Sequence, residues 1–271
     1  MHALKRIARR AIKAMLKPLS DRWVYTARSG LAKGMRIKGG FLFLPKPLPK
    51  EATLLEEIAP ELRGKVVYDI GANVGLTTLF FARCVGQEGL VIAFEPVPDV
   101  VRRLRENVRI NRLRNVRIYE VALGDQETQS TIHFTPEASG IATFRHDMAQ
   151  QYHKEYRLQA CLVEVVRLDT IVRRESLPLP HFIKIDVEGF EYQVLQGAQG
   201  VIEQSHPQIF LELHGSSVED CRQMWGNIYR FLSEHGYSIT SPAKNPITEA
   251  NLLEEGNLWY CRYISSSVGN D

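Results

Sequence analysis

Short apolar segments alternate with amphipathic segments of ten or more residues through most of this chain, and that alternation limits the folds open to it. The pattern predicts strands at residues 66–70, 90–94, 116–123, 131–134, 162–166, 182–187 and 209–213. It predicts helices at residues 53–59, 76–85, 99–111, 190–202 and 218–235, and a closing hairpin from residues 237–240 and 258–263. Strand-helix-strand units of this kind are right-handed and build a largely parallel sheet. The expected fold class is therefore α/β, with helices on both faces of the sheet.

Composition and cysteine spacing exclude several classes of protein. The chain is 44% hydrophobic and 24% charged, which is typical of a soluble globular protein. No apolar run reaches the ~18 residues that a membrane-spanning helix needs. The four cysteines lie far apart without a CxxC pair, which argues against a disulfide framework and a zinc site. We therefore expect a cytoplasmic protein with reduced thiols.

Positive charge is concentrated at the start of the chain. Residues 1–38 hold eleven Lys or Arg and one acid, whereas the remainder has a net charge of −7. Within residues 1–18 the apolar side chains repeat at helical spacing, and Pro18 ends the pattern. Such a basic helix can touch a membrane peripherally, act as an organelle presequence, or pack on its own domain or a partner. The acidic remainder has no basic-aromatic stripe, so no nucleic-acid partner is expected.

A glycine-rich loop follows the first strong strand and runs directly into a helix. It contains Asp69, Gly71, Asn73 and Gly75, at the edge of the sheet where ligands of open α/β folds bind. A dinucleotide loop requires G-x-G-x-x-G, but Asn73 stands at the second glycine position and Leu76 at the third. The Gly-Lys-Ser/Thr of a phosphate loop is also absent. The loop is thus either a plain glycine turn or a site for a different cofactor.

The ends of the next two strands favour a cofactor. Glu95 follows the second strand, 20 residues after Gly75, where a carboxylate can accept hydrogen bonds from both ribose hydroxyls. After the third strand, Ala122 and Asp125 could cradle an adenine, although Gly-Asp is also a common turn. Together these positions predict a pocket for an adenosine that carries a small amino-acid-like group.

Five motifs resemble those of the FkbM-type S-adenosylmethionine-dependent methyltransferases. They are VVYDIGANVG, AFEP, VALGD, FIKIDVEGFEYQVLQGA and FLELHG, within residues 64–214. The resemblance implies a Rossmann-like class I methyltransferase fold with a seven-stranded sheet and one antiparallel strand. It also implies that the methionine part of the cofactor is bound by Asp69, Gly71, Asn73 and Gly75. Glu95 would bind the ribose, and Ala122 and Asp125 would bind the adenine. We expect residues 51–264 to be the methyltransferase domain, 1–50 the basic helix with a connecting segment, and 265–271 a flexible tail.

The reacting centre is expected at the ends of the fourth and fifth strands. Lys184, Asp186 and Glu188 alternate along one strand exit, and Glu212 and His214 alternate along the next. One hypothesis is that Asp186, Glu212 or His214 takes or directs the proton of an acceptor hydroxyl. Another is that Asp186, Glu188 and His214 bind a divalent cation. A third is that Lys184 pairs with Glu188 or Glu212 and only neutralises the strand end.

Two classes of function remain open from the sequence. The first is an O-methyltransferase that uses S-adenosylmethionine and acts on a sugar, a glycan or another natural product, as the resemblance implies. The second is a non-catalytic protein that binds an adenosine cofactor and is tethered to a membrane by residues 1–18. The acidic cluster favours the first, because tethering would not need it. The polar residues 135–160 are either a lid over the acceptor or an ordinary exposed loop.

Overall fold

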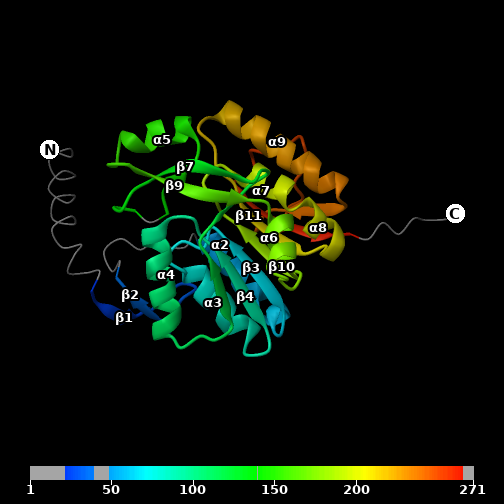
Figure 1. Ribbon diagram of the computed structural model, residues 1–271. Helices are drawn as coiled ribbons and strands as arrows, with labels where there is room; N and C mark the ends of the chain where they lie inside the picture. The colour runs from blue at the N-terminus through cyan, green and yellow to red at the C-terminus, as the bar shows by residue number, and fades with distance from the viewer. Residues whose placement is uncertain (1–21, 40–48, 139, 265–271) are drawn as a thin grey trace.

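A seven-stranded sheet forms the centre of the molecule in the computed structural model, which describes residues 22–39, 49–138 and 140–264 (Figure 1). Its strands, in spatial order, are β12 (Tyr237–Thr240), β13 (Leu258–Tyr263), β11 (Gln208–Glu212), β10 (Phe182–Ile185), β3 (Val66–Ile70), β4 (Leu90–Phe94) and β5 (Val116–Tyr119). Within this described sheet, only β13 runs antiparallel to its neighbours. The predicted class I arrangement, including its single antiparallel strand, is confirmed.

Helices cover both faces of the sheet, as the sequence predicted. On one side lie α2 (Pro49–Ile58), η1 (Ala59–Leu62), α3 (Leu76–Val85) and α4 (Pro98–Ile110). On the other side lie α6 (Leu168–Arg174), α7 (Glu191–Gly197), α8 (Gln199–Ser205) and α9 (Val218–Glu234). The strands serve both layers because successive side chains point to opposite faces. Val67 packs with α2 and α3, while Tyr68 packs with the opposite layer, and both are fully buried.

The segment predicted as one strand at residues 116–123 is divided between two sheets, which corrects that prediction. β5 ends at Tyr119, and β6 (Ala122–Leu123) pairs with β9 (Gln159–Val166). A four-stranded sheet results, in the order β6, β9, β7 (Thr128–Phe134) and β8 (Ala142–Thr143). Glu120, an exposed charged residue directly after β5, stands at the break, while Ala122 and Leu123 are buried in the second sheet.

The helix predicted at residues 190–202 is also divided. α7 ends at Gly197, where an added Cβ would lie 1.8 Å from the backbone oxygen of Gly124. α8 starts immediately afterwards, and the carboxylate of Asp169 accepts hydrogen bonds from the backbone N–H groups of Gly200 and Val201 at 3.1 and 2.9 Å. A carboxylate from α6 therefore caps the second helix.

We expect Asp169→Ala to lower the free energy of unfolding by about 1 kcal/mol, because it leaves two helix N–H groups without their acceptor. Urea unfolding measures the loss. The control is Glu249→Ala, which removes an exposed ion pair with Arg230 and should cost less than about 0.5 kcal/mol. Equal losses in the two variants would contradict the capping role.

Part of the segment expected to be a simple connection forms a hairpin against α4. β1 (Val24–Thr26) pairs with β2 (Arg36–Lys38), and Ile37 of β2 is fully buried. The backbone N–H of Lys38 donates to Asn107 Oδ1 at 2.8 Å. The predicted basic helix of residues 1–18 and the predicted tail of residues 265–271 lie outside the described residues. No helix in the described ranges is both long and apolar enough to cross a membrane.

Candidate active site

A cavity of about 230 Å³ lies at the carboxyl ends of β3, β4, β10 and β11. This is the edge where the sequence placed the ligand. The residues predicted for the site that line the cavity are Gly71, Asn73, Glu95, Ala122, Lys184, Asp186, Glu188 and Glu212. The second sheet contributes Ile132, Ala142 and the adjoining Phe144 to the opposite wall. The cavity is therefore closed by a second sheet, whose strands at 131–134 and 162–166 were predicted but whose separation from the main sheet was not.

The shape of the glycine-rich loop is set by close contact with a neighbouring backbone segment as well as by the need to admit a ligand. Gly71 has a φ of 77°, and an added Cβ would lie 1.8 Å from the backbone oxygen of Asp186. Gly75 has a φ of 93° and precedes α3, but it is not among the residues lining the cavity. Asp69 is fully buried and accepts hydrogen bonds from the hydroxyls of Thr77 and Thr78. Asp69 thus fixes the loop to the first turn of α3.

Glu95 holds the loop from the neighbouring strand. One of its oxygens accepts from the N–H of Asn73 at 2.9 Å, and the other accepts from the N–H of Val97 at 3.0 Å. The side chain is only 6% exposed, and this burial raises the pKa of Glu95 to about 7, although both hydrogen bonds oppose the rise. Each oxygen keeps a further lone pair, so the carboxylate can still accept from a ligand in the cavity.

Of the two residues predicted to bind the adenine, one lines the cavity and the other does not. Ala122 lines the cavity beside Val121 and Leu123. Asp125 does not line it, and lies instead in a separate polar hollow where its backbone oxygen accepts from Arg167 Nη1 at 2.8 Å. The adjoining wall contains the aromatic pair Phe144 and Phe190, whose ring centres are 5.0 Å apart. This part of the cavity is an apolar slot suited to a flat ring.

Lys184 is the buried cation of the site. Its Nζ lies 2.9 Å from Asp186 Oδ2 and 4.0 Å from Asp69 Oδ1, and the side chain is 2% exposed. Burial disfavours its charge, but Asp186, Asp69 and Glu51 outweigh that effect and hold the pKa of Lys184 above its ordinary value. The same ion pair helps to keep the pKa of Asp186 below its ordinary value against burial. The expected pairing of Lys184 with Glu188 or Glu212 is replaced by pairing with Asp186.

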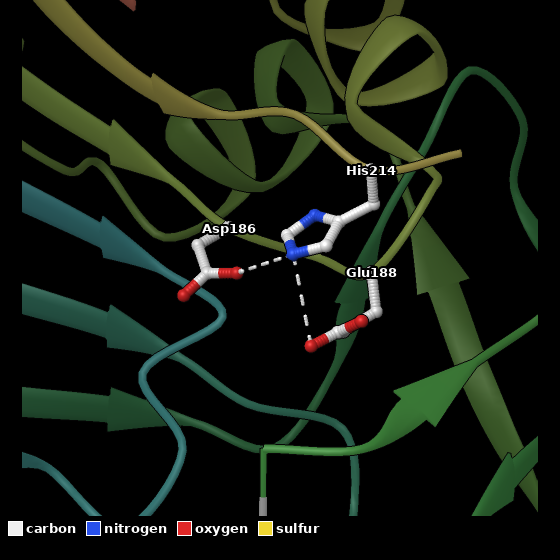
Figure 2. A group of neighbouring side chains, drawn as sticks. All are labelled: Asp186, Glu188 and His214. Carbon is white, nitrogen blue, oxygen red and sulfur yellow. Dashed lines mark ion pairs between the residues drawn. The ribbon is translucent and has the colours of Figure 1, made fainter. Parts of the chain in front are cut away.

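His214 does not line the cavity, but it stands beside the carboxylates of Asp186 and Glu188, which do (Figure 2). Its Nε2 lies 3.7 Å from Glu188 Oε1, 3.8 Å from Asp186 Oδ1 and 4.0 Å from Glu212 Oε1. Its Nδ1 lies 2.9 Å from Glu191 Oε1. Burial works against the charged ring, but the hydrogen bond to Glu191 and the nearby carboxylates raise the pKa of His214 to about 10. The structure thus brings Asp186, Glu188 and Glu212, which the sequence placed at the same strand ends, around this histidine.

Burial also raises the pKa of Glu188 and Glu212, the two carboxylates that are not paired with a lysine. It raises the pKa of Glu188 to about 7, and with Asp186 it raises the pKa of Glu212 to about 7. Glu188 has a φ of 55°, and its Oε2 accepts a hydrogen bond of 2.6 Å from the hydroxyl of Tyr152. Tyr152 belongs to α5 (His146–His153), so the region predicted as a lid or loop contacts the cluster directly.

Sequence reasoning missed Glu51 and Tyr152 in this site. Glu51 lines the cavity from α2 and is 7% exposed. It lies on the same helix face as the buried Leu54, Leu55 and Ile58, and a carboxylate on an apolar face was a readable signal. No such signal marked Tyr152, because only the folded second sheet brings α5 to Glu188.

Comparison with known proteins identifies the family. Residues 69–239 match the Methyltransferase FkbM domain, which is more than half of the chain. The chain belongs to the FkbM methyltransferase family. The matched residues include all the predicted site residues, from Asp69 to His214, and the elements that carry them.

Relatives within and around this family are distant. Methyltransferase 1 from Beauveria bassiana is 26% identical over 52% of this chain and 61% of its own length. The 31-O-demethyl-FK506 methyltransferase FkbM from Streptomyces tacrolimicus is 27% identical over 67% of this chain and 76% of its own. Hexuronic acid methyltransferase AglP from Haloferax volcanii is 30% identical over 59% of each chain. The chain thus spans about three fifths of the length of two of these relatives.

Proposed function

We propose that this chain is an S-adenosylmethionine-dependent methyltransferase that acts on a hydroxyl oxygen of a sugar, a glycan or another natural product. One observation carries the proposal. A single cavity is lined by Glu95, which follows β4, and by Asp186, Glu188 and Glu212 from the ends of β10 and β11, with His214 against those carboxylates. The first part suits a ribose, and the second suits a reacting hydroxyl.

The residues present fit this cofactor. Its sulfonium and ammonium groups are positively charged, and the cavity wall supplies the carboxylate of Glu51. Glu95 would accept from the ribose hydroxyls, while Phe144 and Phe190 border the slot for the adenine ring. When bound, S-adenosylmethionine supplies a methyl group already activated by a positively charged leaving group.

Glu212 is the group that we assign to accept the hydroxyl proton. Lys184 holds one oxygen of Asp186, and Tyr152 holds one oxygen of Glu188. Among the hydrogen bonds of the described residues, none is made to the carboxylate of Glu212, although it lines the cavity. In the transfer, the O–H bond of the acceptor breaks and its proton passes to Glu212. The oxygen bonds to the methyl carbon as the methyl–sulfur bond breaks, with its electron pair remaining on sulfur.

Two relatives support the acceptor class. The names of the Streptomyces and Haloferax proteins specify an O-demethylated natural product and a hexuronic acid, respectively. At 27–30% identity these names support oxygen as the methylated atom and leave the particular acceptor to experiment.

Calorimetric titration with S-adenosylhomocysteine tests the cofactor site. We expect Glu95→Ala to bind at least about tenfold more weakly than wild type, a loss of about 1.4 kcal/mol, because the ribose loses its acceptor. Glu219→Ala is the control, since that carboxylate is 86% exposed on α9 and should leave binding unchanged. A folded wild-type protein that binds no S-adenosylhomocysteine would contradict the proposal.

The affinity for S-adenosylhomocysteine should depend on pH, because Glu95 gains or loses a proton. The pKa of Glu95 is raised to about 7, and ribose hydroxyls donate to its ionised form, so binding requires loss of the proton. Affinity should therefore rise up to about tenfold between about pH 6 and about pH 8, as the ionised fraction rises. Glu95→Gln carries no titrating proton and should lose most of that rise. An equal rise in this variant would assign the dependence to another group.

A further inference from the structure

Three side chains at the mouth of the cavity direct one free atom each toward a common point (Figure 2). His214 Nε2 lies 3.8 Å from Asp186 Oδ1 and 3.7 Å from Glu188 Oε1. These separations are too long for hydrogen bonds, which end near 3.2 Å. The three ligand-type atoms all lie within 4.8 Å of one another. The nitrogen therefore faces two carboxylates with a gap between them.

The other donor or acceptor atom of each side chain is held by a residue outside the three. Asp186 Oδ2 accepts from Lys184 Nζ at 2.9 Å. Glu188 Oε2 accepts from the hydroxyl of Tyr152 at 2.6 Å. His214 Nδ1 lies 2.9 Å from Glu191 Oε1. Outer partners of this kind orient the ligands of protein metal sites, and a ligating histidine almost always gives its second ring N–H to such a partner.

Glu191 provides the observation that separates this group from an ordinary acidic cluster. It is fully buried at the start of α7, and its Oε1 also accepts from the N–H of Gly189 at 3.0 Å. Its Oε2 is buried and has no hydrogen-bond partner among the described residues. A carboxylate buried in this way favours an N–H on Nδ1 of His214. Nε2 then points toward Asp186 and Glu188, whose charges are balanced either by a proton on this ring or by a cation in the gap.

We propose that Asp186, Glu188 and His214 bind a divalent cation of the Mg²⁺ or Mn²⁺ type; the inference rests on the proposed function. Metal–oxygen and metal–nitrogen bonds of about 2.0–2.1 Å place neighbouring ligand atoms about 3.0–3.4 Å apart, so these atoms, 3.7 and 3.8 Å apart here, need to close by only about half an ångström around an ion. Two carboxylates and one imidazole leave coordination positions open. Because the site adjoins the cavity, the acceptor hydroxyl would occupy one of them.

The cation gives the site a second role in the transfer. A hydroxyl bound to a divalent cation has a lowered pKa, so its proton passes more readily to Glu212. The bonds formed and broken are those of the proposed methyl transfer, and no oxidant or reductant is required. The acceptor class narrows to molecules whose hydroxyl can reach the cation, and a neighbouring hydroxyl or carboxylate on the acceptor would strengthen its binding.

Binding of Mn²⁺ to the chelator-treated full chain tests the proposal, with free Mn²⁺ followed by electron paramagnetic resonance. We expect one Mn²⁺ per chain and a rise in Tm that a chelator reverses. Asp186→Asn, Glu188→Gln and His214→Ala should each weaken binding at least about tenfold, since loss of even an outer partner of a metal ligand costs about 10- to 100-fold. The control is Glu203→Gln, whose carboxylate lies 3.4 Å from His235 Nε2 and has no place in the group.

The outcomes separate this proposal from the proposed function. Wild-type protein that binds S-adenosylhomocysteine but shows neither Mn²⁺ binding nor a Tm shift would overturn the cation site and leave the proposed function intact. Protein that binds neither would overturn both. Unchanged Mn²⁺ binding in all three variants would also overturn the proposal, because the ion would then lie elsewhere. The isosteric Glu188→Gln, checked by circular dichroism, guards against loss of binding through misfolding.

Discussion

Asp186→Asn should reduce methyl transfer by about 10²- to 10⁴-fold while S-adenosylhomocysteine still binds within a few-fold of wild type. The expected loss follows from the position of this carboxylate, which lines the cavity between Lys184 and His214. Because Glu212 accepts the proton, Asp186 acts by positioning the acceptor hydroxyl and the groups beside it, and a misplaced reacting group costs about 10²-fold or more. The substitution keeps the shape of the side chain and removes its charge. Turnover numbers and calorimetric affinities of the same preparations measure the two quantities separately.

The matched control for this substitution is Glu219→Gln on the exposed face of α9. It removes one carboxylate from the chain at a distance from the cavity and should leave both turnover and binding unchanged. A variant Asp186→Asn that turns over at the wild-type rate would remove Asp186 from the reacting centre. A parallel loss of cofactor binding would instead place Asp186 in the cofactor site.

Lys184→Met should lower the free energy of unfolding by about 3–5 kcal/mol, which is the usual cost of breaking a buried ion pair. Lys184 is the buried cation against Asp69 and Asp186, and Asp69 is fully buried. Without Lys184, these carboxylates must lose their charge or remain unpaired in the interior. Urea unfolding, with the m value compared between variants, measures the effect.

Two further variants separate charge from packing. Lys244→Met removes an exposed lysine whose Nζ lies 3.1 Å from Glu57, and should cost less than about 1 kcal/mol. Lys184→Met combined with Asp69→Asn should cost less than the sum of the two single changes, since the second change relieves an unpaired charge left by the first. Strict additivity in the double variant would contradict the assigned role of the ion pair.

The main sheet could be predicted from the sequence because its strands are short, apolar and separated by helices. The bounds expected for the first two strands and the helix between them agree with β3, α3 and β4. The second sheet could not be predicted, because β6 pairs with β9, which lies far along the chain. An apolar run such as 116–123 can be buried against either sheet, and only the tertiary pairing decides where it divides.

The candidate site was predictable where residues follow strands directly. Asp186, Glu212 and Glu95 reach one cavity because parallel strands bring their carboxyl ends to the same edge. Asp125 stands two residues beyond β6, and the turn after that strand takes it to another hollow. Tyr152 comes from a helix held over the cluster by the second sheet. Its role depends on contacts that no local pattern encodes.

Transfer of an isotopically labelled methyl group from S-adenosylmethionine tests the central claim most directly. Wild-type protein, Asp186→Asn and Glu219→Gln would be incubated with hydroxylated sugars and natural-product extracts, and the products analysed by mass spectrometry. We expect labelled methyl ethers or esters on oxygen with wild type and Glu219→Gln, and almost none with Asp186→Asn. Labelling on nitrogen or carbon would contradict the claim, as would no labelling by protein that binds S-adenosylhomocysteine across the acceptor set.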